Sequence, residues 1–284
     1  MPVLDTTTKP ATGRIDLQCH GTRIAIRSRN ARILERVLGN LPPGAAIAER
    51  GRPDVLYRVV ESTSGLDADC IVLATRHDPD EGGRIARVSD EESAADSLLQ
   101  DIEFRIALHA PTRVFIHAAA VEWLGRTIVL PGTSHCGKST LTLALLRSGA
   151  RYLSDEFTIL DEDGHVLAFP RPLQLREDQG IRRISATQVA TSGTAALPMG
   201  LVVRTWYESS ATWAPQALGA GRTALALLEN AVIARTRPQL ALSRIARALA
   251  DGATGLIGPR GDADETAQAI LAWAAREWRA GDCA

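Results

Sequence analysis

The first third of the chain carries short runs in which apolar and polar residues alternate, the pattern of β-strands that bury one face. Such strands are predicted at residues 14–17 and 22–27, and two mainly apolar runs, residues 55–60 and 70–74, predict two more strands. The first two flank His20-Gly21 and predict a hairpin. After them, Asn30 can cap a short helix with an apolar face of Ile33, Leu34, Val37 and Leu38. Residues 13–110 are therefore predicted to form a small α+β module, preceded by a disordered tail over residues 1–12.

A longer helical pattern closes this module and leads into a second domain, residues 111–284. Apolar positions recur at helical spacing from Asp90 to about Leu108, and Pro111 ends the helix. Beyond it, apolar runs predict a hairpin over 113–130 and strands over 151–160 and 201–207. Three C-terminal helices are predicted at 222–234, 239–250 and 263–279, with a short strand near 254–257. The fold class expected from this mixture is α/β.

Composition and charge argue against two classes of partner, nucleic acids and membranes. The 284 residues carry a net charge of −1, which gives no support to nucleic-acid binding. The sequence has no apolar run long enough to span a bilayer, and its N-terminus lacks the pattern of a signal peptide. The four cysteines are scattered without disulfide or metal spacing. We therefore expect a cytoplasmic protein with reduced thiols and with neither a nucleic-acid nor a membrane partner.

One stretch has the G-x-x-x-x-G-K-S pattern of a phosphate-binding loop. It reads Gly132-Thr133-Ser134-His135-Cys136-Gly137-Lys138-Ser139-Thr140. The stretch follows the apolar run 127–130 and precedes a helix-forming run over 139–147, so a buried strand and a helix N-terminus flank it. In this motif the lysine reaches the β- and γ-phosphates, and the serine hydroxyl holds Mg²⁺. These nine residues are the candidate ATP-binding residues.

Lysine usage points to the same place. Of 32 basic residues only two are lysines, Lys9 in the polar tail and Lys138 in the loop. A chain that uses arginine almost everywhere has kept a compact ammonium where a phosphate loop needs one.

Two further stretches carry candidate chemistry on either side of the loop. Asp155 and Glu156 lie in the predicted strand 151–160, where an acid can hold Mg²⁺ or accept a proton in phosphoryl transfer. Adjacent side chains on a strand face opposite ways, so the two acids share a site only if the strand bends or ends there. His117 lies in the strand that leads to the loop, either as a core residue or as part of the nucleotide site.

The order of these elements resembles the HPr kinase/phosphorylase family. The resemblance covers residues 117–160 and rests on the histidine strand, the phosphate loop and the acidic pair. It implies a P-loop fold shared with phosphoenolpyruvate carboxykinase and an ATP- and Mg²⁺-dependent kinase that phosphorylates a serine. It also implies roles: Asp155 as the base, His117 as its partner, Lys138 on the transferred phosphoryl group, and Ser139 with Glu156 and Asp155 as magnesium ligands.

The sequence departs from that family in three ways. The acidic pair is Asp155-Glu156 where the family usually has two aspartates, the loop interior Thr133-Ser134-His135-Cys136 differs from the family's usual loop, and the glycine-rich second signature is missing. The chain is therefore closer to shorter HPr-kinase-like enzymes of peptide biosynthesis, including lasso-peptide kinases, which phosphorylate a C-terminal serine. The alternatives are a small-molecule kinase on the same fold, a carboxykinase-like enzyme and a nucleotide-sensing regulator. The acceptor, the reverse reaction and any homo-oligomer are left open.

Overall fold

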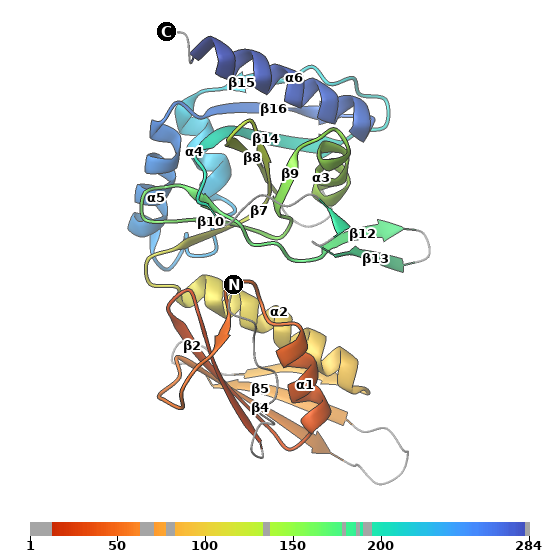
Figure 1. Ribbon diagram of the computed structural model, residues 1–284, viewed down its shortest axis with the longest axis vertical. Helices are drawn as coiled ribbons and strands as arrows, with labels where there is room; N and C mark the ends of the chain where they lie inside the picture. Colours follow the sequence, from red (N-terminus) through yellow and green to blue (C-terminus); the bar gives the residue numbers. More distant parts are fainter. Residues whose placement is uncertain are drawn as a thin grey trace. The chain divides into compact units, whose positions relative to one another are not determined.

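The chain, seen in a computed structural model, divides into two compact units, Met1–Pro111 and Thr112–Ala284 (Figure 1). The structure describes residues 13–62, 71–77, 83–132, 137–177, 180–185, 188–189 and 195–281. The predicted tail over residues 1–12 lies outside the described residues, as do Thr133, Ser134, His135 and Cys136 of the predicted loop. Both units combine sheets with helices, which confirms the α/β class.

The first unit is a mixed sheet with two helices. Its strands are β1 (Arg14–Cys19), β2 (Thr22–Ser28), β3 (Ala46–Ile47), β4 (Val55–Ser62), β5 (Ile71–His77) and β6 (Gly83–Val88). They are ordered β3-β1-β2-β4-β5-β6, with β2 and β4 parallel and the other neighbours antiparallel. The helices are α1 (Ala31–Gly39) and α2 (Glu91–His109). The predicted β1–β2 hairpin and both helices are confirmed, whereas β3 and β6 were not predicted.

Side-chain caps start both helices of this unit where the sequence predicted. The Asn30 side chain accepts hydrogen bonds from the backbone N–H groups at the start of α1, and Asp90 does the same at α2. The two helix starts are also linked, because the Asn30 amide donates to Glu91 at 2.8 Å. Apolar side chains of α1, α2 and the strands form the core, among them Ile24, Ile26, Ile33, Leu34, Tyr57, Leu98 and Ile102.

The second unit is built on a larger mixed sheet. Its strands are β7 (Val114–Trp123), β8 (Arg126–Pro131), β9 (Arg151–Ser154), β10 (Phe157–Leu160), β11 (Val166–Leu167), β14 (Met199–Tyr207), β15 (Gln216–Leu218) and β16 (Thr254–Arg260). The order is β11-β10-β7-β8-β14-β16-β15, and β9 also pairs with β7. Only β8, β14 and β16 run parallel to one another. A separate hairpin joins β12 (Leu173–Glu177) and β13 (Gly180–Ile184).

Among the described residues, this unit also has four helices: α3 (Lys138–Arg147), α4 (Ala220–Leu228), α5 (Pro238–Ala250) and α6 (Ala263–Gly281). Helices α3 and α6 pack together over the sheet (Figure 1). Their apolar side chains meet those of β7, β8, β14 and β16 in one buried cluster that includes Leu130, Leu141, Val203, Leu256, Ile270 and Trp278. This packing fixes the N-terminus of α3 at the edge of the sheet where β8 ends.

Two predicted elements differ from the structure. The strand expected over 151–160 is two strands, β9 and β10, separated by Asp155 and Glu156. The predicted end of the helix over 222–234 was wrong, since α4 ends at Leu228. The reason is a tertiary contact: the backbone around Ala231 pairs with β7, with Val232 N–H donating to Phe115 at 2.9 Å. These backbone bonds take the place of further helical turns.

Candidate active site

The predicted loop begins and ends as a phosphate loop does. The buried strand β8 leads to Gly132, and α3 starts at Lys138 after Gly137. Gly137 is the N-cap, with a left-handed backbone (φ 81°, ψ 21°) that favours glycine. Among the described residues, no side chain caps the N-terminus of α3, and its first turn has no acidic residue. The helix dipole makes such a helix start a favourable place for an anion.

Lys138 closes this loop from the helix side. Its ammonium Nζ donates to the backbone carbonyl of Gly132 at 2.7 Å, so the side chain reaches back across the loop. Thr140, also predicted to bind nucleotide, is exposed on the first turn of α3. The Lys138 ammonium thus lies against the loop backbone, whereas the Thr140 side chain faces solvent.

Ser139 joins the loop to the acidic pair. Its hydroxyl donates to Asp155 Oδ2 at 2.7 Å. Asp155 follows directly after β9 and its side chain is buried, at 7% exposure. The other carboxylate oxygen, Oδ1, is buried too and has no hydrogen-bond partner among the described residues. This oxygen is available to a ligand that arrives at the site.

The surroundings of Asp155 suit a group that accepts a proton near neutral pH. Burial raises the pKa of Asp155 to about 6, and the nearby Glu156 charge also raises it, while the hydrogen bond from Ser139 lowers it. A base works best when its pKa lies near the operating pH.

Glu156 and His117 form a second, more exposed pair beside the first. His117 Nδ1 lies 3.5 Å from Glu156 Oε1, and both side chains are about half exposed. His117 lowers the pKa of Glu156, chiefly through the hydrogen bond to its carboxylate. The His117 ring also lies 4.7 Å, centroid to centroid, from the ring of Phe157, which opens β10.

The backbone of His117 holds three segments in register. Its N–H donates to the Asn230 carbonyl at 2.8 Å, and its own carbonyl accepts from the Gly132 N–H at 3.3 Å. On the β10 side His117 lies opposite Phe157. The predicted residues His117, Gly132, Gly137, Lys138, Ser139, Asp155 and Glu156 are thus brought to one edge of the sheet.

The carboxylates of the predicted metal set face different partners. Ser139 and Asp155 supply adjacent oxygens, whereas the Glu156 carboxylate lies against His117. Among the residues that the structure describes, no group of three or more His, Cys, Asp or Glu side chains is arranged to hold a metal ion. A serine and one carboxylate nevertheless suit Mg²⁺, which is usually bound through one or two carboxylates together with substrate phosphates. The unpartnered Asp155 Oδ1 fits that arrangement.

Two residues at the site were not predicted from the sequence. Arg260, at the end of β16, is 3% exposed and donates to the Gly137 carbonyl at 2.9 Å. Asn230 supplies the carbonyl that His117 meets. Neither position has a local signal, because each reaches the site through strand pairing of distant segments.

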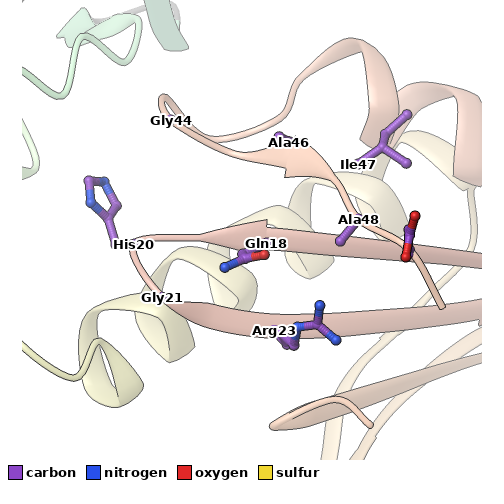
Figure 2. Close-up of a pocket in the computed structure, with 9 residues that line it drawn as sticks. Gln18, His20, Gly21, Arg23, Gly44, Ala46, Ile47 and Ala48 are labelled. Atoms are coloured by element: carbon purple, nitrogen blue, oxygen red, sulfur yellow. The ribbon is translucent and has the colours of Figure 1, made fainter. Parts of the chain in front are cut away.

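The first unit has a shallow pocket of its own. It is open at the end of the β1–β2 hairpin beside β3, with Gln18, His20 and Arg23 along it (Figure 2). Ile47 of β3 also lines it and is 62% exposed. The lining mixes amide, imidazole, guanidinium and carboxylate groups without one dominant charge, so it indicates no single class of ligand.

Comparisons with known proteins gave no match from which a function could be inferred. A scan against protein-family models gave no match, and a search of curated proteins gave none either. Within the part of the chain that the structure describes, no helix is long and apolar enough to cross a membrane.

Proposed function

We propose that this chain is an ATP-dependent kinase that transfers the γ-phosphate to a serine hydroxyl of a peptide or protein. The observation that carries the proposal is the 2.7 Å hydrogen bond from Ser139 to Asp155. It joins the first turn of the helix after a phosphate-loop motif to a buried carboxylate. Phosphoryl transfer needs positioning, charge stabilisation and a base near the nucleophile, and this arrangement offers all three.

In the proposed reaction Asp155 is the base. The serine oxygen forms a bond to the γ-phosphorus as the bond from that phosphorus to the β-phosphate oxygen breaks, which yields phosphoserine and ADP. Asp155 accepts the serine proton and then releases it to solvent. Its pKa of about 6 supports this role, since the carboxylate is ionised at neutral pH yet basic enough to take a proton.

Lys138 and the start of α3 would bind the phosphates. The ammonium is held 2.7 Å from the Gly132 carbonyl, within the loop that the phosphates would enter. The backbone N–H groups of the first turn would hydrogen-bond phosphate oxygens. Ser139 and Asp155 would hold Mg²⁺. When bound, that ion neutralises charge on the β- and γ-phosphates.

His117 and Glu156 would set the net charge beside Asp155. They lie 3.5 Å apart beside Asp155, and both are half exposed. His117 can balance the charge of the two acids, which would otherwise repel the incoming phosphates. This is the role that the resemblance to HPr kinases implies for the histidine.

The sheet of the second unit supports an HPr kinase-like fold. The loop strand β8 lies between an antiparallel neighbour, β7, and a parallel one, β14. A usual doubly wound P-loop sheet is mostly parallel throughout. We infer that the acceptor is a peptide with a C-terminal serine, as in the lasso-type kinases that the sequence resembles.

Mass spectrometry of peptides incubated with the protein, ATP and Mg²⁺ tests the proposal. The probes are synthetic peptides that end in serine, matched to peptides with the same serine moved to an internal position. We expect one added phosphate on a serine with the wild type and none with Asp155→Asn, which should still bind ATP. If Asp155→Asn phosphorylates as fast as the wild type, Asp155 is not the base.

The remaining outcomes separate the alternatives. Phosphate on internal serines but not terminal ones would retain the kinase and reject the C-terminal acceptor. Tight ATP binding with no transfer to any peptide or protein would favour a small-molecule kinase or a nucleotide-sensing regulator.

A further inference from the structure

Arg260 lies at the same sheet edge as the phosphate loop. Strands β8, β14 and β16 are parallel, so their carboxyl ends meet at one edge, where ligands of α/β sheets commonly bind. β8 ends there at Pro131, β14 at Tyr207 and β16 at Arg260. The side chain of Arg260 is nevertheless 3% exposed, so the chain has placed a charged group in the interior at this edge. A buried guanidinium is costly unless it serves specific partners.

Its contacts lead directly to the loop. The guanidinium Nη2 donates to the Gly137 carbonyl at 2.9 Å, and Nη1 donates to the Gly261 carbonyl at 3.2 Å. Its carbon Cζ lies 5.6 Å from the centroid of the Tyr207 ring, a distance suited to a cation–π contact. Tyr207 itself is 61% exposed, so the buried guanidinium contacts a ring that also faces solvent.

The contact with Gly137 fixes the direction of one phosphate-binding group. A peptide unit is planar, so the carbonyl of Gly137 and the N–H of Lys138 point in opposite directions within one rigid plane. The Gly137 carbonyl also accepts from the Leu141 N–H of α3 at 3.2 Å, so Arg260 and the first helical hydrogen bond together aim the Lys138 N–H. Gly137 needs its left-handed backbone for this, and a Cβ there would overlap the Arg260 guanidinium.

Two cations therefore hold the two described ends of the loop. Lys138 donates to the carbonyl of Gly132, where the loop begins, and Arg260 donates to the carbonyl of Gly137, where it ends. Both add positive charge at the N-terminus of α3, which the helix dipole already makes attractive to anions.

We propose that Arg260 is a positioning residue for polyphosphate: together with the Leu141 N–H it holds the Gly137–Lys138 peptide plane, it adds charge at the start of α3, and Tyr207 is its cation–π partner. This inference rests on the proposed function, because it takes the 132–139 stretch to be a phosphate loop. It predicts that Arg260 acts on the phosphate chain of the nucleotide and not on its base.

Calorimetric titration with inorganic tripolyphosphate tests this without any need for turnover. The proteins are the wild type, Lys138→Ala, Arg260→Gln and Arg222→Gln, the last being an exposed arginine of α4 that serves as the matched control. We expect Arg260→Gln to weaken binding roughly 10- to 100-fold, the effect of losing one charged hydrogen bond. Arg222→Gln should bind as the wild type does.

A spectroscopic signature separates positioning from a purely structural role. The backbone amide resonance of Lys138 should shift in Arg260→Gln and stay in place in Arg222→Gln. A structural role alone would lower the unfolding temperature of the unliganded protein and leave tripolyphosphate affinity unchanged when measured below that temperature; this result would overturn the proposal. If Arg260→Gln does not fold, Tyr207→Ala replaces it, with an expected weakening of roughly 2- to 5-fold; unchanged affinity in that variant would equally overturn the proposal.

The two hypotheses fail in different ways. Wild-type affinity in Arg260→Gln together with lost affinity in Lys138→Ala would reject the role of Arg260 and leave the phosphate loop standing. A wild-type protein that binds neither tripolyphosphate nor ATP would reject both.

Discussion

Ser139 on the first turn of α3 donates a 2.7 Å hydrogen bond to Asp155, a carboxylate that is 93% buried and placed between two strands. One bond thus links a helix that begins a candidate anion site to the acid that would serve as base. The burial of this carboxylate also bears on stability, because a buried carboxylate is costly to ionise even when it accepts a hydrogen bond.

Replacement of Asp155 by asparagine should stabilise the protein at neutral pH. The folded-state pKa of about 6 lies above the ordinary value of an aspartate, so the folded protein binds the proton more tightly than the unfolded chain. Stability is therefore lost as pH rises from about 4 to about 6, and the loss is complete above that range. Asp155→Asn should raise the unfolding free energy at pH 8 by on the order of 2 kcal/mol and change it little at pH 4.

Thermal unfolding of wild type and Asp155→Asn across that pH range measures the effect. Asp251→Asn is the matched control, since Asp251 is exposed at the end of α5. Stability curves of wild type and Asp155→Asn that stay parallel from pH 4 to pH 8 would contradict the buried-charge explanation.

Lys138→Ala should slow serine phosphorylation by roughly 100-fold or more, the usual cost of removing a group that stabilises transition-state charge. The ammonium that now donates to Gly132 would be absent from the loop. Initial rates at saturating ATP give the comparison, and Lys9→Ala, which changes the only other lysine, is the control. A rate within threefold of wild type would remove Lys138 from the proposed mechanism.

The pairing of His117 with Glu156 predicts a titration shift. His117 lowers the pKa of Glu156, so His117→Ala should move that pKa upward toward the ordinary glutamate value. Carboxyl ¹³C chemical shifts recorded against pH would follow Glu156 directly. His165→Ala is the control, because the histidine paired with Glu156 is His117, whereas His165 lies between β10 and β11. An unchanged Glu156 titration would mean that the 3.5 Å pair does not persist in solution.

The first unit offers an independent test of pH-linked stability. Arg14 Nε donates to Asp16 at 2.7 Å, and this hydrogen bond lowers the pKa of Asp16. An acid with a lowered pKa stabilises the fold above its unfolded pKa, and this stabilisation is lost as pH falls through the folded value. Asp16→Asn should therefore cost on the order of 1 kcal/mol at pH 7 and little near pH 3.

Urea unfolding at both pH values checks this, with Glu35→Gln, an exposed change on α1, as the control. An equal cost of Asp16→Asn at the two pH values would show that charge is not the origin of the effect.

Much of the site was predictable because its signals are local. The buried run before Gly132, the glycines of the loop and the helix-forming run after it specify strand, turn and helix within the same short stretch. The requirement that the strand end at Asp155 could also be stated, since adjacent side chains on a strand face opposite ways. The structure meets that requirement with a break between β9 and β10.

The parts that escaped prediction depend on contacts between distant segments. Arg260 is one arginine among 30, and only the parallel pairing of β14 with β16 brings its strand end to the loop. Residues 229–234 contain good helix formers, yet the backbone there bonds to β7. Tertiary hydrogen bonds outweigh local helix propensity here, and for this reason the helix predicted from the sequence extended beyond the observed end of α4.

The break between β9 and β10 has a consequence for how freely this site can vary. Both strands lie on β7, so the ladder is anchored before Asp155 and again after Glu156, and neither acid supplies a ladder bond. Substitution at these two positions therefore alters the chemistry without shifting the register of the sheet. The Asp155-Glu156 pair therefore presents two adjacent carboxylates without taking part in the pairing of either strand. The residues that maintain the sheet register are therefore different from the two acids that would carry the chemistry.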